Sequence, residues 1–114
     1  MDPEGAIREA KKGTAELFVL ALLEHEAQHG YELARLIDER SHGALTFNLA
    51  SLYATLYKLE DRNLIRGRWV ERAGQRRRRY YRMTDKGRLA LEAQRREWRR
   101  FFELVRDLAG LSYA

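Results

Sequence analysis

The spacing of apolar residues changes once along the chain, near Ile65. Before that point apolar residues recur every three or four positions, as they do on one side of an α-helix. From Ile65 they alternate with arginines, and after a short loop at Gly74 a second run extends from Arg76 to Met83. Two such runs joined by a short glycine-containing loop predict a β-hairpin. An isolated hairpin is marginally stable in water. We therefore expect the hairpin to pack on the helices through Ile65, Trp69, Tyr81 and Met83.

Two helices are predicted in the first 40 residues. Thr14 has the side chain of an N-cap and is followed by apolar residues at helical spacing, so we expect the first helix to begin there. Residues 1–13 are expected to be either a frayed terminus or a short separate helix. A second helix is predicted from about Tyr31 to Arg40, between Gly30 and a Ser-His-Gly turn.

The third predicted helix, Leu49 to Arg62, has two different sides. One side carries an apolar stripe made of Leu49, Leu52, Tyr53, Leu56 and Leu59. The other side offers small or basic side chains, Ser51, Thr55, Lys58 and Arg62. Asn63 can adopt the left-handed conformation that ends a helix. Two helices joined by a short turn, the second with a small polar outer side, are typical of a helix-turn-helix.

One long helix is predicted from Asp85 to about Ala109, with Thr84 as its N-cap and Gly110 as its end. An apolar seam repeats every seven residues and consists of Leu91, Gln94, Trp98, Phe101, Val105 and Leu108. At a rise of ~1.5 Å per residue the helix is about 35 Å long, more than so small a domain covers by itself. We expect it to pair with a second copy. In the alternative, the seam packs on the chain's own first helix.

The predicted fold is therefore mainly α with a small β-hairpin. Residues 1–84 are expected to form a winged helix-turn-helix domain, in which the hairpin is the wing. Residues 85–114 are expected to form a C-terminal dimerisation helix.

Positive charge is concentrated in the hairpin. Residues 62–82 contain nine arginines and one acid, Glu71, a net charge of +8, whereas the remainder has 13 basic and 16 acidic residues, a net charge of −3. A localised basic segment on an otherwise acidic protein predicts a polyanionic partner, nucleic acid first and an anionic membrane second. The third interpretation is that these arginines form a solvent-exposed charged surface with no binding partner.

Composition excludes several classes of function. The chain has no cysteine, so disulfides, thiolate metal sites and cysteine nucleophiles are absent. Its longest apolar run, Leu17 to Leu23, is too short to cross a bilayer, and the first four residues lack the basic start of a signal peptide. We expect a cytoplasmic protein that is not an enzyme and needs neither a cofactor nor a metal.

The order of elements and six short motifs resemble the PadR family of bacterial transcriptional regulators. The motifs follow one another at matching spacing, and together the resemblance covers residues 13–108. They are Leu17 to Leu23, His29-Gly30-Tyr31, Ala50-Ser51-Leu52-Tyr53, Leu59-Glu60, Leu64-Ile65, and Tyr80-Tyr81 followed by Thr84 and Gly87. The single C-terminal helix is similar to that of the family's shorter subgroup.

The sequence departs from the family pattern in three ways. Ala50 stands where glycine is usual, and Asn48-Leu49 stands where a Ser-Pro pair is common. Asn63 replaces a typical glycine, a change that the left-handed preference of asparagine tolerates. The first two changes lie at the start of the third predicted helix, which the resemblance implies is the helix that recognises DNA. They therefore affect which bases this recognition helix prefers.

The resemblance implies contacts to double-stranded DNA. Tyr31, Ser51 and Tyr53 would hydrogen-bond backbone phosphates, although Tyr53 equally fits a core position on the apolar stripe. Asn48, Thr55 and Lys58 are the candidates for base edges in the major groove. Arg76, Arg77 and Arg78 at the hairpin tip would enter or flank the minor groove. By strand alternation we expect Arg76 and Arg78 to point outward.

The resemblance also implies a homodimeric repressor that binds a pseudo-palindromic operator and is released by a small-molecule inducer. Trp98 is large for a two-helix seam. It would leave a gap lined by Phe101, Leu91 and Gln94, in which a flat aromatic effector could stack. The alternative is that Trp98 is simply a buried seam residue.

Three other interpretations are open from the sequence. The basic hairpin could belong to an adaptor for anionic membranes or acidic protein surfaces, and the last helix could belong to a dimerisation module whose arginines only aid solubility. Residues 25–29 also match His-Glu-x-x-His, a zinc-protease signature, but they lie at a helix end with no further ligand signature. We therefore expect His25 to be exposed and His29 to belong to the turn.

Overall fold

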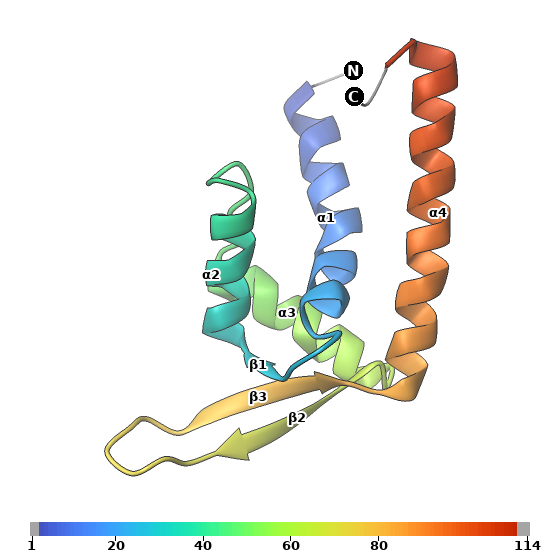
Figure 1. The fold of residues 1–114 in the computed structure, drawn as a ribbon. Helices are drawn as coiled ribbons and strands as arrows, with labels where there is room; N and C mark the ends of the chain where they lie inside the picture. Colours follow the sequence, from blue (N-terminus) through green and yellow to red (C-terminus); the bar gives the residue numbers. More distant parts are fainter. Residues whose placement is uncertain (1–2, 112–114) are drawn as a thin grey trace.

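The computed structural model describes the backbone of residues 3–111 and the side chains of residues 13–111. This part of the chain forms four helices and a three-stranded sheet (Figure 1). The order is α1 (Pro3–Leu22), β1 (Gln28–His29), α2 (Gly30–Arg40), α3 (Leu49–Asp61), β2 (Ile65–Val70), β3 (Arg78–Met83) and α4 (Asp85–Ala109). The sheet is antiparallel with strand order β1-β3-β2. The prediction of a mainly α winged helix-turn-helix fold with a long last helix is confirmed.

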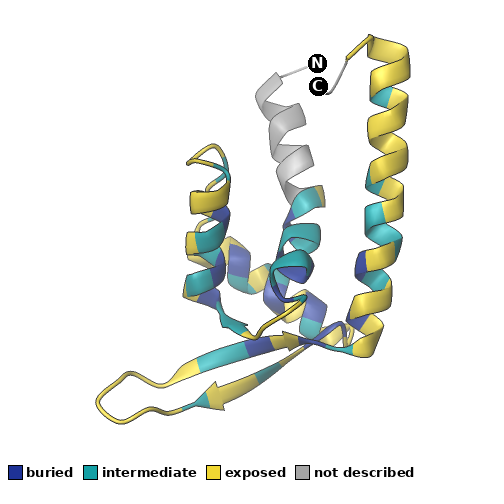
Figure 2. Ribbon diagram, in the orientation of Figure 1, coloured by how far each residue is buried: buried dark blue, intermediate teal, exposed yellow. Residues whose placement is uncertain are grey.

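The core lies where the lower ends of α1, α2 and α4 meet α3 and the sheet (Figure 2). Leu20, Leu33, Leu56 and Leu91 each bring a fully buried side chain from a different helix, and Tyr81 brings one from β3. The predicted inward positions Ile65, Tyr81 and Met83 are buried. Burial of these side chains fixes the position of the wing relative to α3.

The first helix begins earlier than the sequence predicted. It starts at Pro3 and passes through Gly13 and Thr14 without a break, so the prediction of an N-cap at Thr14 is wrong. A glycine and a threonine inside a helix cost about 1 kcal/mol or less each. The run of alanine, arginine, glutamate and lysine before them favours helix enough to offset that cost. The separate terminal helix is thus part of α1, and residues 1–2 lie outside the described residues.

Strand β1 was not predicted. Gln28 and His29 pair with Tyr81 and Tyr80 of β3, and two residues are too few to show an alternating pattern. In the wing, β2 and β3 pair over six residues each, and residues 71–77 form the loop between them, because β3 begins only at Arg78.

Trp69 is not packed on the helices as predicted, because the wing extends past them and leaves Trp69 51% exposed. Its ring is instead covered by the guanidinium of Arg77, 4.5 Å from the ring centroid. Trp69 therefore belongs to the surface of the wing.

A close approach at Gly87 fixes the start of α4. Thr84 caps the helix by accepting a hydrogen bond from the Gly87 N–H, and its hydroxyl also lies 2.7 Å from the carbonyl oxygen of Asn63. A Cβ at Gly87 would lie 2.0 Å from the carbonyl oxygen of Leu64. Asn63 ends α3 with φ +62°, as predicted, and Gly110 ends α4 with φ +69°.

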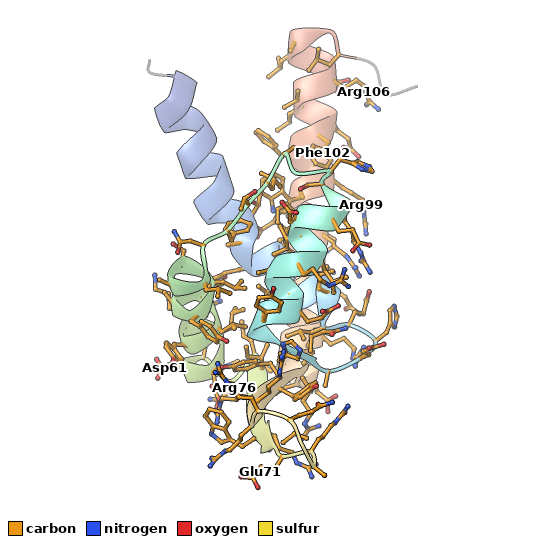
Figure 3. All side chains as sticks on the ribbon, turned by 90° about the vertical axis from the view of Figure 1, so that its left-hand side faces the viewer. Asp61, Glu71, Arg76, Arg99, Phe102 and Arg106 are labelled. Carbon is orange, nitrogen blue, oxygen red and sulfur yellow. The ribbon has the colours of Figure 1, made fainter. Side chains whose placement is uncertain are left out.

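The two halves of α4 have different environments. The first half packs on α1, with Leu91 in the core and Arg95 bonded to Glu24 at 2.8 Å. Beyond that point the two helices diverge, and the second half of α4 exposes Phe101, Phe102, Leu104 and Leu108 (Figures 2 and 3). The predicted seam thus has two environments. Its first half packs on α1 of the same chain, and its second half is exposed and available for a second copy.

Candidate nucleic-acid interface

A groove of about 560 Å³ separates α2 and α3 from the wing. We call it the wing groove. The view in Figure 3 faces this side of the molecule, with Arg76 and Glu71 at the tip of the wing. The groove combines tyrosines and arginines from three elements. It is lined by His29, Tyr31, Leu49, Tyr53, Tyr57, Trp69, Arg76, Arg77, Arg78, Arg79 and Tyr81.

The start of α2 and the facing part of α3 bring two of the predicted tyrosines into this groove. Tyr31, in the first turn of α2, is 60% exposed. Tyr53 is half-buried, and a Cβ at Gly30 would lie 2.8 Å from its ring. A side chain in place of Gly30 would therefore displace the end of the Tyr53 ring. The Tyr53 hydroxyl lies at that contact, and its ring lines the groove.

Asn48 caps the recognition helix. Its side-chain oxygen accepts a hydrogen bond from the Ser51 N–H at 2.7 Å, and its carbonyl oxygen accepts one from the Leu52 N–H. The amide NH₂ of Asn48, at an exposed position, is the part left for a base or phosphate. Asn48 thus has a structural role that the sequence analysis did not assign to it.

Asn48→Ala is expected to lower the free energy of unfolding by about 1 kcal/mol, because the cap of α3 is lost. Asn48→Asp keeps a capping oxygen but replaces the NH₂ donors with negative charge. We expect it to unfold at the wild-type urea concentration and to bind duplex DNA more weakly. Urea unfolding followed by circular dichroism checks the first effect, and a duplex titration checks the second. Equal DNA affinity of wild type and Asn48→Asp would assign Asn48 to capping alone.

The predicted base-reading side of α3 is only partly exposed. Ser51 and Lys58 are exposed, but Thr55 is half-buried and its hydroxyl donates to the carbonyl oxygen of Ser51 at 3.2 Å. Arg62 on the same side bonds to Glu16 of α1 at 3.0 Å. This side of α3 therefore turns partly toward α1.

Sequence reasoning missed two residues that line the groove from α3. Leu49 and Tyr57 lie one turn before and one turn after Tyr53, and Tyr57 is 63% exposed. Leu49 was assigned to the buried stripe, but it is exposed as well. The spacing of four residues between these positions was the available signal.

The wing arginines are not equivalent. Arg79 is directed at α3, where it donates to Glu60, and the same carboxylate accepts a hydrogen bond from the Gly67 N–H at 3.1 Å. Arg77 covers Trp69 and lies 4.0 Å from Glu71. Arg76, Arg77 and Arg78 are all exposed, so outward placement is not restricted to Arg76 and Arg78.

His29 connects the wing to the start of α2. Its Nδ1 accepts the N-cap hydrogen bond from the Glu32 N–H at 3.1 Å, and its Nε2 lies 2.9 Å from Arg78 Nη1. The ring also packs edge-on against Tyr80, with 5.2 Å between centroids. Burial lowers the pKa of His29, and the positive charge of Arg78 lowers it further.

The low pKa of His29 predicts that acid destabilises the protein. Between the lowered pKa and about 6.5 the unfolded chain binds more protons at this site than the folded one, so stability falls as the pH drops through that window. Protonation also removes the Nδ1 acceptor that caps α2. We expect the wild-type Tm to fall more between pH 7.5 and pH 5.5 than that of His29→Asn, which keeps a capping oxygen. Parallel pH profiles of the two proteins would contradict this assignment.

The residues proposed for an effector are not all brought together. Trp98 is half-buried and contacts Phe101 edge-on, with 5.9 Å between centroids. A shallow site of about 370 Å³ beside them is lined by Gly13, Glu97, Trp98 and Phe101. Leu91 is fully buried in the core and is not accessible to a ligand, and Gln94 is half-buried.

The His-Glu-x-x-His stretch does not form a helix. His25 and Glu26 lie in an exposed bend and His29 lies in β1, so the two histidines are not one helical turn apart. Within residues 3–111 no helix is both long and apolar enough to cross a bilayer.

Comparison with known proteins points to one family. The sequence profile of the transcriptional regulator PadR-like family matches residues 19–93. A PadR family transcriptional regulator from Eggerthella lenta superposes with a TM-score of 0.81 and 26% identity, covering 96% of this chain and 93% of that one. A PadR-like transcriptional regulator from Bacillus cereus has a TM-score of 0.75 and 27% identity, with coverages of 89% and 96%.

A third similar structure is Bacillus subtilis PadR in complex with operator DNA, with a TM-score of 0.63 and 23% identity. It aligns with 69% of this chain and 45% of that one. An uncharacterised protein of Lysinibacillus sphaericus is 27% identical over 94 residues, which is 82% of this chain and 86% of that protein. The profile match spans more than half of the sequence. The chain belongs to the PadR-like family of transcriptional regulators.

Proposed function

We propose that this protein is a homodimeric repressor that binds a pseudo-palindromic operator. The observation that carries the proposal is the wing groove, in which α3 and the arginines of the wing face one concave surface. A helix that enters the major groove beside a basic hairpin is a common geometry of DNA recognition. Family members are transcriptional regulators rather than enzymes, as the sequence predicted. The operator complex of Bacillus subtilis PadR supports a DNA partner for this fold.

Each predicted residue then has a chemical role. Tyr31, Ser51 and Tyr53 position the helix by donating hydrogen bonds to phosphates. The exposed ammonium of Lys58 and the NH₂ of Asn48 are the donors available to base edges. Arg76, Arg77 and Arg78 contact the phosphates of the adjacent minor groove. Thr55 contributes its methyl group and an acceptor oxygen but no donor, because its hydroxyl hydrogen is bonded to the helix backbone.

The second half of α4 is the proposed dimer interface. Phe101 is 53% exposed and Leu108 is 85% exposed. Exposure of these apolar side chains to water is unfavourable, and pairing with a second copy would bury them. Two copies related by a twofold axis present two α3 helices to one face of DNA, which matches a pseudo-palindrome.

We also propose that an aromatic effector stacks on Trp98 and Phe101 at this interface. Gln94 lies one turn away and could hydrogen-bond it, whereas Leu91 takes no part. Release from DNA requires that the effector bind the two states of the dimer with different affinity.

Selection of bound sequences from random duplex DNA tests the proposal. We expect enrichment of one motif in two inverted half-sites, separated by about one helical turn, ~34 Å, or a small multiple of it. Recovery of unenriched sequences, with equal retention on anionic vesicles, would contradict it and favour an adaptor that binds polyanions through charge alone.

A further inference from the structure

The β-sheet has a second basic surface on the side opposite the helices. In β2 and β3, the residues that alternate with Ile65, Tyr81 and Met83 point away from the core. We call this surface the outer wing face and define it by Arg66, Arg68, Arg72, Tyr80 and Arg82. These five residues, with Ala27 and Val70, line a hollow of about 200 Å³.

Among the described residues, the arginines of this face lack acidic partners, as do Arg76 and Arg78 at the tip, whereas three other arginines of the basic segment have them. Arg62 bonds to Glu16, Arg79 to Glu60, and Arg77 lies near Glu71. Among the described residues, none of the four outer arginines is within ion-pair distance of a carboxylate; Arg72 instead covers the Tyr80 ring at 5.8 Å. Six hairpin arginines therefore have no acidic partner in the part of the chain that the structure describes, and four of them lie on the outer wing face; the other two, Arg76 and Arg78, lie at the tip.

The sheet places two of these charges directly opposite each other. Arg66 and Arg82 are cross-strand partners, and like charges at such positions destabilise a sheet. Neither residue packs in the core, since both are exposed. The fold thus carries an electrostatic cost that neutralisation by a bound polyanion would remove.

We propose that the outer wing face binds the phosphate backbone of duplex DNA outside the stretch that α3 and the wing groove contact. This inference rests on the proposed function. Arg66 and Arg68 of β2 and Arg72 of the following loop form a row of up to about 20 Å, which suits a chain of phosphates better than a single anion. Guanidinium groups bind phosphate oxygens in bidentate geometry. A protein partner would be expected to meet more apolar surface than Val70 and Tyr80 provide.

The test uses the full chain and a 40-base-pair duplex centred on the sequence recovered by selection. Arg66→Gln/Arg82→Gln removes two charges from the outer wing face. Arg40→Gln/Arg88→Gln removes two exposed charges from the end of α2 and the first half of α4, outside the wing and the proposed dimer interface, and is the matched control. Affinity is measured as a function of salt. The slope of log K for dimer binding against log salt should become shallower by about 3.6 for the first variant, since two contacts are lost from each of two chains and each contact contributes ~0.9. It should change little for the control.

Thermal unfolding at low salt gives a readout that is independent of DNA. The Tm of Arg66→Gln/Arg82→Gln should equal or exceed that of wild type, because repulsion across the strands is relieved. An unchanged salt slope in this folded variant would overturn the inference while leaving the proposed function intact. In that case binding of wild type, but not the variant, to polyglutamate would assign the face to acidic proteins. Failure of the wild-type chain to bind any duplex saturably would instead contradict the proposed function.

Discussion

Gly87→Ala is expected to lower the free energy of unfolding by about 3 kcal/mol, a large share of the stability of so small a domain. The added Cβ would lie 2.0 Å from the carbonyl oxygen of Leu64 and 2.8 Å from the side chain of Met83. The oxygen belongs to the backbone at the start of the wing, so it cannot move without shifting β2. The first turn of α4, which Thr84 caps, must then separate from the sheet.

Gly13→Ala is the matched control for this substitution. Gly13 lies inside α1, and no atom lies within 4 Å of the position of its added Cβ. We expect it to raise the free energy of unfolding by up to about 1 kcal/mol, because alanine favours helix over glycine. Urea unfolding measures both. Equal stability of Gly87→Ala and wild type would show that α4 does not depend on this close approach.

Phe101→Glu is expected to convert the dimer to a monomer and to weaken binding to the selected duplex by more than about 100-fold, because linkage of two half-sites is lost. A carboxylate in the middle of the exposed apolar part of α4 would be desolvated without a partner on pairing. Sedimentation at micromolar concentration measures the first effect, and duplex titration measures the second.

Leu89→Glu provides the control on the same helix. Leu89 is 67% exposed but lies outside the seven-residue repeat that contains Leu91 and Trp98. It should remain a dimer with wild-type affinity for DNA. Dissociation of both variants would mean that any added negative charge on α4 disrupts the dimer, and persistence of the Phe101→Glu dimer would place the interface elsewhere.

Features set by neighbouring residues could be predicted from the sequence. Thr84, Asn63 and Gly110 act at helix ends through their own side chains or backbone preferences, and the structure confirms all three. The hairpin followed from its alternation. The start of α1 and the strand at Gln28 could not be predicted in the same way, because they depend on a balance of small propensities and on pairing with a distant strand.

The candidate site depended more on tertiary structure. Tyr31 and Tyr53 line the wing groove, but so do Tyr57, which only its spacing of four residues from Tyr53 indicated, and Trp69, which had no distinguishing local signal. The sequence showed that the hairpin is basic and not which arginines are neutralised. Glu16 and Glu60 come from other elements, and only the fold brings them to Arg62 and Arg79.

The central claim is that two copies of this chain bind one operator through α3 and the wing. The most direct measurement is the stoichiometry and affinity of the complex with the selected duplex, compared with a scrambled duplex of equal length and composition. We predict two chains per selected duplex, with affinity at least ~10³-fold above that for the scrambled duplex at physiological salt. Equal affinity for the two duplexes, or one chain per duplex, would contradict sequence-specific binding of one operator by two copies of this chain.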